Sequence, residues 1–519
     1  MPRGFSLAVK DEVGGIPNKI AEKELKGRTD LTDKVVVTID GEDAKDFDDA
    51  ISIEMLENKN YMLGVHIADV SYFVEENSEL DKEAFSRGTS VYLIDNVVPM
   101  LPEKLSNKLC SLMPNKLRLT ISCFMEVSGS GEVVNYSFCE SFIKSSARMT
   151  YSKVAEILNG DMASRDEYNS FVPVFELMRE LAMILRDKRM ERGSIDFDFP
   201  EPKVIVDESG APTDIVINEN SVSTKIIEEF MLAANETVAK YIGGLGLPLV
   251  YRVHEKPNSE KIEQFAVLVR NMNYKFKTGK EVSPKEMQRL LFKIKGTPQQ
   301  TIITAVALRS LMKARYSEEN LGHFGLAATS YCHFTAPIRR YPDLIVHRIL
   351  RHAIRRTFNK KLIAHFENIA EEAARQSSET EIAAVEAERE WVGYKMCEFM
   401  KDKVGQNFKA FVSSVTSFGL FVQLPSTVEG LIKMSDLDDD YYEYDEASLS
   451  LTGRRTGKKY SMGQQLDVCL AKVSEELRQI DFVLATEEQK EVKGKNGKAS
   501  KRKYKKDRKN GRSKQKSKA

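Results

Sequence analysis

Few of the residue patterns that mark common cofactor or covalent chemistry occur in this chain of 519 residues. The six cysteines are scattered and form no CxxC pair, which argues against zinc sites and disulfide bonds and favours a reducing cytoplasm. The seven histidines are equally dispersed and form no HExxH motif, so a histidine-ligated metal is not expected. We find no internal repeat and neither a P-loop nor a GxGxxG motif, which are the usual nucleotide-binding fingerprints.

Long apolar segments are absent as well. No apolar run reaches the roughly 18 residues that a membrane helix needs, and the first residues, Met1–Ser6, show no signal-peptide pattern. Charged residues make up 30% and hydrophobic residues 42% of the chain, which is an ordinary balance for a soluble protein. The sequence therefore predicts a cytoplasmic protein without a membrane partner, long enough for two or more domains.

The net charge of zero hides a strong asymmetry. Of the 77 basic and 77 acidic residues, 15 basic and 2 acidic ones lie in residues 490–519, so this end carries +13 and the rest −13. Because residues 486–519 are rich in Lys, Gly and Ser, this tail is predicted to be disordered. Its expected partner is nucleic acid, in the form of the ribosome or structured RNA, and a tail that only confers solubility is the alternative.

The most distinctive segment is T38-I-D-G-E-D-A-K-D-F-D-D-A50, which gathers acidic residues. Four of its carboxylates are candidate metal ligands: Asp40, Asp46, Asp48 and Asp49. Two carboxylates about 4 Å apart repel each other by roughly 4 kcal/mol at an effective dielectric constant of about 20, so a fold that gathers several needs a cation. An all-oxygen ligand set suits Mg²⁺, with Mn²⁺ as the alternative, and such sites commonly hydrolyse or form phosphodiesters.

The neighbouring residues predict that these acids lie at the ends of strands. Lys34–Ile39 is a β-branched run typical of a buried strand, and Ala50–Met55 is expected to form the next one. Strand ends are where α/β proteins usually keep their sites. An acidic surface loop is the alternative. An EF-hand is excluded, because its glycine and closing glutamate are missing from their places counted from Asp40.

A second segment, Y331-C-H-F-T-A-P-I-R-R-Y-P-D-L-I-V-H-R348, is predicted to be a loop that leads into a helix. Pro342 suits the first helical position, which puts Arg339 and Arg340 just before the helix, near its positive end. The planar fork of a guanidinium suits bidentate contact with a phosphate. For either arginine, an ion pair with a structural carboxylate is the alternative.

The remaining pattern predicts an α+β protein in several parts. Residues 1–30 form a polar lead-in, and residues 31–402 form a domain with a sheet core and many helices, closed by a long amphipathic stretch. Residues 403–485 have the short strands, glycines and aromatics of a small all-β barrel. The basic tail, 486–519, follows.

Together the two segments resemble the RNB catalytic domain of the ribonuclease II/ribonuclease R family, and the basic tail and the Gly41–Lys45 insert make the chain most similar to bacterial ribonuclease R. Further matching motifs are Arg87–Leu93, Pro99–Pro102, Glu228–Asn235 and Tyr251–Pro257. This resemblance implies an RNB domain. Residues 403–485 in turn resemble an S1 barrel of the OB fold, and the matching residues are Phe408, Phe411, Phe418–Phe421 and Glu429–Ile432. The RNB resemblance also implies a processive 3′-to-5′ hydrolytic exoribonuclease that degrades single-stranded RNA with a free 3′ end to nucleoside 5′-monophosphates in RNA turnover. A non-catalytic RNA-binding protein that kept the fold is the alternative.

The resemblance further assigns roles to single residues. The four aspartates would hold one or two Mg²⁺ ions and orient the attacking water, with Asp48 counted as catalytic, and Arg339 would brace the scissile phosphate. The RNA-binding residues that it implies are Tyr92 and Phe197 as base clamps, Glu388 along the channel, Arg340, and Phe418 and Phe421 on the S1 barrel. Taken alone, Tyr92 and Phe197 are more typical of core aromatics, and Glu388 is more typical of an exposed helical acid.

Two features depart from the family pattern. Lys433 stands where many S1 domains have a histidine, although a lysine can still meet a phosphate. Family members also carry two cold-shock barrels before the catalytic domain, and this sequence begins where the second would end, which indicates a fragment or a short form. We expect the protein to be a monomer.

Overall fold

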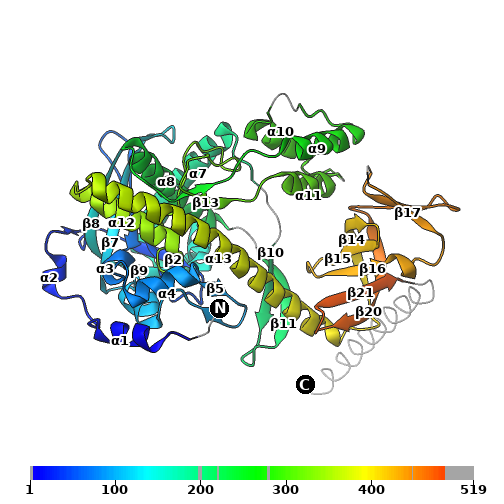
Figure 1. Cartoon of the computed structure of the whole chain (residues 1–519), viewed down its shortest axis with the longest axis horizontal. Helices are drawn as coiled ribbons and strands as arrows, with labels where there is room; N and C mark the ends of the chain where they lie inside the picture. The colour runs from blue at the N-terminus through cyan, green and yellow to red at the C-terminus, as the bar shows by residue number, and fades with distance from the viewer. Residues whose placement is uncertain are drawn as a thin grey trace, which may run out of the picture. The chain divides into compact units, whose positions relative to one another are not determined.

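The computed structural model describes residues 4–196, 201–218, 221–277, 281–297, 299–446 and 448–485 (Figure 1). The chain divides into two units. The first unit comprises the described residues within Met1–Asp198, Glu219–Lys295 and Val306–Arg389. The second comprises those within Phe199–Asn218, Gly296–Ala305 and Glu390–Ala519. Phe197 and the tail 486–519 lie outside the described residues.

A seven-stranded sheet forms the centre of the first unit, in the order β1-β8-β7-β4-β3-β2-β9. Its strands are β1 (Thr29–Asp30), β2 (Val37–Asp40), β3 (Asp49–Met55), β4 (Tyr61–Ala68), β7 (Leu117–Val127), β8 (Val133–Lys144) and β9 (Ala147–Thr150). Strands β2, β3, β4, β7 and β8 pair antiparallel, whereas β1 joins β8 and β9 joins β2 in parallel. The two strands predicted around the acidic segment are therefore present, as β2 and β3.

Helices cover this sheet, and most residues of its central strands β4 and β7 are buried. Helices α7 (Val172–Arg192) and α8 (Val222–Gly244) pack against β3, β4 and β7, and α12 (Tyr341–Arg355) packs against β8. The other helices of this unit are α1 (Leu7–Gly15), α2 (Glu22–Leu25), α3 (Val70–Phe73), α4 (Glu79–Arg87), α5 (Tyr151–Leu158), α6 (Met162–Glu167), α9 (Ser259–Asn271) and α10 (Pro284–Ile294). Two small strand pairs, β5 (Val91–Tyr92) with β6 (Val97–Val98) and β12 (Tyr251–Val253) with β13 (Arg315–Ser317), complete it. None of the described helices has the length and apolar character to span a bilayer.

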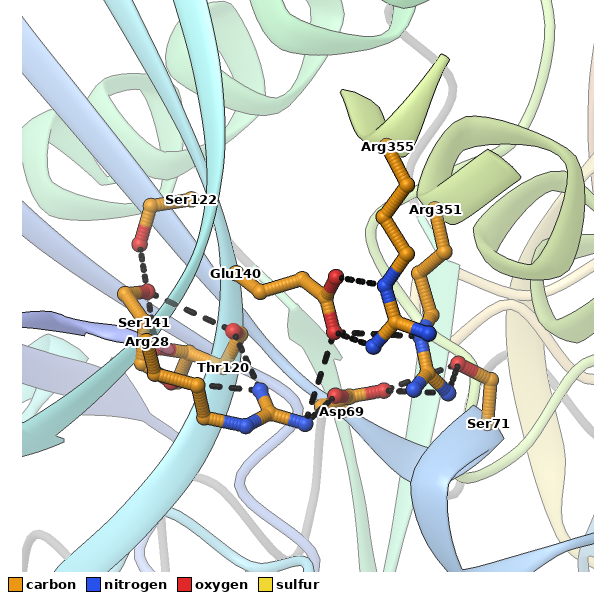
Figure 2. Close-up of polar contacts among 9 residues, drawn as sticks. All are labelled: Arg28, Asp69, Ser71, Thr120, Ser122, Glu140, Ser141, Arg351 and Arg355. Carbon is orange, nitrogen blue, oxygen red and sulfur yellow. Dashed lines mark hydrogen bonds and ion pairs between the residues drawn. The ribbon is translucent and has the colours of Figure 1, made fainter. Parts of the chain in front are cut away.

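A partly buried ion network fastens α12 to the sheet (Figure 2). Glu140 on β8 accepts two hydrogen bonds from Arg355, at 2.5 and 2.7 Å, and its Oε2 lies 3.3 Å from Nε of Arg351. Asp69, just after β4, accepts a hydrogen bond from Nη2 of Arg28 at 2.6 Å. Paired charges of this kind tolerate burial only when they are hydrogen-bonded. The network therefore fixes the helix whose first turn follows the arginine pair.

The second unit contains a closed barrel with the strand order β14-β15-β16-β21-β20. Its strands are β14 (Asn407–Thr416), β15 (Gly419–Gln423), β16 (Glu429–Lys433), β20 (Gln465–Ser474) and β21 (Gln479–Leu484). A three-stranded sheet of β17 (Tyr442–Asp445), β18 (Ser450–Gly453) and β19 (Lys459–Ser461) is inserted between β16 and β20, and β10 (Glu201–Val206) pairs with β11 (Pro212–Asn218). The predicted order of domains, a helix-and-sheet domain followed by a small all-β barrel, is confirmed. Helices α11 (Gln300–Ser310) and α13 (Lys360–Lys401) have residues in both units.

Candidate active site

The four aspartates of the acidic segment line one pocket of about 300 Å³ in the first unit. Asp40 ends β2, Asp49 begins β3, and Asp46 and Asp48 lie in the loop between these strands. Because β2 and β3 are antiparallel neighbours, the end of one strand and the start of the next meet at the same edge of the sheet. The structure thus brings together the carboxylates that the sequence singled out.

Burial raises the pKa of three of these carboxylates. The pKa of Asp40 rises to about 8, because the side chain is buried and because Asp49 lies close by. Burial raises the pKa of Asp49 to about 6, against the opposing charge of Arg339. The pKa of the buried Asp48 lies well above its usual range for the same reason. Such a pocket favours either bound protons or a cation.

Two buried carboxylate oxygens indicate that a metal ion fits this pocket. Oδ2 of Asp40 and Oδ2 of Asp48 are buried and accept no hydrogen bond from any described residue. Free lone pairs on oxygen are what Mg²⁺ requires of its ligands. Within the described ranges, no three His, Cys, Asp or Glu side chains converge into a ready metal cluster. The fit therefore rests on donor chemistry and charge.

The two arginines of the second segment have different surroundings. Nε of Arg339 lies 3.7 Å from Oδ2 of Asp48, its side chain is 45% exposed, and its guanidinium makes no hydrogen bond to any described residue. The Arg340 side chain, which is 18% exposed, donates to both carboxylate oxygens of the buried Asp343 at 2.9 and 2.8 Å. Both side chains line the pocket. Arg339 is therefore free to contact a ligand, whereas Arg340 has the structural carboxylate that the sequence left open.

The loop that carries the arginines is held by side chains from distant parts of the chain. The N–H of Ile338 donates to Oδ1 of Asp48 at 2.7 Å, and the N–H of Phe334 donates to Oδ1 of Asn235 on α8 at 2.8 Å. These bonds satisfy buried backbone groups, which would otherwise be costly. As a result, the acidic segment and the arginine segment position each other.

The pocket also contains polar side chains that the sequence analysis did not assign to it, namely Tyr151, Glu228, Asn235, Tyr331 and Thr335. Glu228 and Asn235 lie seven residues apart on α8, so they share one face of the helix, and this spacing was visible in the matching motif. Tyr151 reaches the site because Thr150, its neighbour on β9, pairs with Asp40 on β2. No local pattern predicts that pairing.

Tyr92 and Glu388 are brought together although 296 residues separate them. The backbone N–H of Tyr92 donates to Oε1 of Glu388 at 2.8 Å, and the Tyr92 hydroxyl donates to Oδ2 of Asp46 at 2.6 Å. Tyr92 is 39% exposed as a residue. In the second unit, the exposed Phe418 lies edge-to-face with Phe421, with ring centroids 5.9 Å apart. The stacking roles of these aromatics stay predictions.

Comparison with known proteins extends over nearly the whole chain. Residues 28–356 match the RNB domain family, and residues 401–484 match the S1 RNA binding domain family. Ribonuclease R 1 of Lactococcus lactis is 45% identical over 479 residues, which are 92% of this chain and 59% of that protein. Ribonuclease R of Thermotoga maritima is 46% identical over 492 residues, which are 94% of this chain and 69% of that protein. This chain thus spans less than two thirds of the Lactococcus relative.

A solved structure agrees with these relationships. Mycoplasma genitalium RNase R, in complex with ribose methylated single-stranded RNA, superposes with a TM-score of 0.87 at 30% sequence identity. The match covers 93% of this chain and 76% of the Mycoplasma chain. The resemblance predicted from the motifs is confirmed by both kinds of comparison.

Proposed function

Because this chain belongs to the RNB family, we propose that it is a processive hydrolytic exoribonuclease that removes nucleotides from the 3′ end of single-stranded RNA. The observation that carries the proposal is one pocket in which four carboxylates face Arg339, whose guanidinium has no hydrogen bond to any described residue. A cluster of acids beside an arginine that still has hydrogen-bond donors available suits the hydrolysis of a phosphodiester, because it can hold both the attacking water and the charged phosphate.

The aspartates are the residues that would hold a divalent cation. Mg²⁺, with Mn²⁺ as the alternative, supplies a Lewis acid and lowers the pKa of a bound water when it occupies such a site. The unpartnered Oδ2 atoms of Asp40 and Asp48 support this assignment, as does the raised pKa of the buried Asp40. Asp48 also orders the arginine loop through the N–H of Ile338, so its role is both chemical and structural.

Arg339 is the group that would stabilise the reacting phosphate. Negative charge grows on the non-bridging oxygens during the attack of water, and a guanidinium donates charge-assisted hydrogen bonds to such oxygens. The partial burial of the pocket strengthens this interaction, because the effective dielectric constant is lower than in water. Arg340, held by Asp343, would keep the loop backbone in place.

Aromatic side chains would bind the RNA without reading its sequence. A base stacked on an aromatic ring gains about 1–3 kcal/mol, whichever base it is. Tyr92, anchored by Glu388, offers a partly exposed ring beside the acids, and Phe197 is the second predicted clamp residue. Phe418 and Phe421 on the barrel would offer further stacking faces to RNA. The products would be nucleoside 5′-monophosphates. The enzyme would act in RNA turnover in the cytoplasm.

A degradation assay separates this proposal from the alternative of a non-catalytic RNA-binding protein. A 5′-labelled single-stranded RNA incubated with Mg²⁺ should be shortened stepwise from its 3′ end, with 5′-monophosphates released, and EDTA should stop the reaction. A circular RNA of the same sequence should persist, because it has no 3′ end. RNA that is bound but never shortened, with or without EDTA, would support the alternative and contradict the proposal.

Replacing Asp48 by Asn gives the matching variant. Asp48→Asn keeps an oxygen for the N–H of Ile338 but removes the charge, so hydrolysis should fall by at least about 100-fold while RNA binding is retained. The control is Asp43→Asn, since Asp43 is an exposed acid of the same segment that does not line the pocket. Full activity of the Asp48→Asn variant would refute the role given to Asp48.

A further inference from the structure

Tyr92 is hydrogen-bonded to two acids, Asp46 of the candidate site and Glu388 of α13. Its hydroxyl donates to Oδ2 of Asp46 at 2.6 Å, a short, charge-assisted bond, and its backbone N–H donates to Glu388 at 2.8 Å. The residue as a whole is still 39% exposed, which leaves it accessible for stacking against a base. The side chain proposed to contact RNA is thus also bonded to one of the four aspartates.

The short segment that carries Tyr92 is itself fixed against the arginine loop. The N–H of Ser90 donates to the carbonyl oxygen of Arg339 at 2.9 Å, and the N–H of Tyr341 donates to the carbonyl oxygen of Gly88 at 2.9 Å. Gly88 has φ +66°, and a Cβ there would lie 1.9 Å from Oγ1 of Thr380, so only glycine fits. The Tyr92 hydroxyl therefore projects from a well-fixed backbone and can hold a neighbouring side chain in position.

Asp46 depends more than the other aspartates on a hydrogen-bond partner that fixes its carboxylate. Asp40 and Asp49 belong to strands β2 and β3, and Asp48 is hydrogen-bonded to the N–H of Ile338. Asp46 lies in the loop between the strands, where its carboxylate would otherwise sample several rotamers. One hydrogen bond leaves further lone pairs on a carboxylate, so the bond from Tyr92 does not block coordination.

We propose that the Tyr92 hydroxyl orients the Asp46 carboxylate for a divalent cation, which makes Tyr92 a positioning residue for the metal site as well as an RNA contact. The inference rests on the proposed function. Residues that orient a metal ligand through a hydrogen bond typically change metal affinity or activity by 10–100-fold. The RNA clamp and the metal site would accordingly share the Tyr92 side chain. Loss of its hydroxyl would weaken metal binding, whereas stacking on RNA would be retained because the ring remains.

The test is the Tyr92→Phe variant of the full chain, titrated with Mn²⁺ alone in the absence of RNA. Free Mn²⁺ is followed by electron paramagnetic resonance, so the measurement does not depend on activity. We expect the Kd for Mn²⁺ to rise by about 10-fold or more, while the length of the final undegraded oligonucleotide stays as in the wild type, because the ring remains. Tyr92→Ala should show the same loss of Mn²⁺ affinity and also a longer final oligonucleotide.

A matched control is Tyr136→Phe, which removes a hydroxyl from a tyrosine on β8 that is 43% exposed and lies outside the pocket. Its Kd for Mn²⁺ should equal that of the wild type. An unchanged or lower Kd in Tyr92→Phe, in a wild type that binds Mn²⁺ and degrades RNA, overturns the inference and leaves the proposed function standing. A wild type that neither binds Mn²⁺ nor degrades RNA overturns both.

Discussion

Arg339 and Arg340 are neighbours in the chain, and the structure gives them different surroundings. Arg339 keeps a partly exposed guanidinium beside Asp48, and Arg340 is locked to Asp343 on the first turn of α12. An arginine that is already paired with a buried carboxylate has little capacity left for a phosphate. We therefore infer that only Arg339 contacts the reacting phosphate and that Arg340 maintains the loop.

Alanine substitutions of the two arginines should separate these roles. Arg339→Ala should lower the rate of hydrolysis by about 10²–10³-fold, the usual cost of removing one group that stabilises developing charge, with the free energy of unfolding nearly unchanged. Arg340→Ala leaves Asp343 buried without its partner and should cost about 3–5 kcal/mol of stability. Single-turnover kinetics and urea unfolding measure the two effects, and equal destabilisation by both substitutions would contradict the assignment.

At this scale the sequence was informative for acids and less so for their partners. Asp40, Asp46, Asp48 and Asp49 are recognisable in the sequence because four carboxylates so close together predict a cation site. The sequence does not reveal whether each arginine binds a phosphate or a carboxylate, because that depends on the orientation of a side chain at the start of a helix. The link from Tyr92 to the site was equally hidden, since it depends on two hydrogen bonds to residues far away in the sequence.

At the scale of elements, α12 joins the site to the body of the sheet. Its start follows the arginine loop, and its later turns carry Arg351 and Arg355, which reach Glu140 on β8 (Figure 2). Arg351 and Arg28 hold the pKa of Asp69 below its ordinary value, although burial alone would raise it. Asp69 therefore contributes its charge to the stability of this network only while it is ionised.

The dependence of stability on pH tests this network. Because the pKa of Asp69 is lower in the folded than in the unfolded chain, its contribution is complete above the unfolded value of about 3.9 and is lost as the pH falls through the folded value. Asp69→Asn should cost about 3–5 kcal/mol at neutral pH, because buried arginines lose a partner. In urea unfolding, the difference from the wild type should shrink below pH 4.

A surface ion pair supplies the control for this prediction. Glu79 and Lys82 form an exposed pair on α4, with N and O atoms 2.6 Å apart, and solvent screens such a pair so that it contributes little. Glu79→Gln should therefore change the free energy of unfolding only slightly at neutral pH. A difference between Asp69→Asn and the wild type that stays constant from pH 7 to pH 3 would show that the charge of Asp69 is not what matters.

The elements themselves followed from the sequence where local patterns decide them. The β-branched run at 34–39 became β2, and the proline at position 342 marks the start of α12, as expected. The pairing of β9 with β2 did not follow, because a parallel neighbour that arrives 110 residues later leaves no mark in either strand. That pairing brings Tyr151 to the site, which explains why the sequence analysis did not include it.

At the scale of the whole molecule, the sequence predicts the order of the domains. It also shows that the two parts of the chain carry opposite charge. The RNB and S1 matches follow each other in the expected order, at residues 28–356 and 401–484. Residues 490–519 carry +13, and the rest of the chain carries −13. An acidic protein repels RNA at long range, so a basic segment would supply much of the attraction.

Deletion of residues 490–519 should reveal that contribution as a change in the salt dependence of RNA binding. Each neutralised phosphate of a single strand adds about 0.7 to the slope of log K against log salt, so a tail that contacts several phosphates should steepen the slope by several units. The deletion should flatten it by the same amount. Binding of a fluorescent single-stranded RNA is measured by anisotropy from 50 to 300 mM KCl, with EDTA present to prevent hydrolysis.

A tail of equal length in which every Lys and Arg is replaced by Gln distinguishes charge from chain length. It should behave like the deletion, because counterion release depends on the number of cations that meet phosphates and not on the residues between them. The rate at which a saturating short RNA is degraded should be the same in all three proteins, since the pocket lies wholly within the first unit. An unchanged salt slope after deletion would instead leave solubility as the function of the tail.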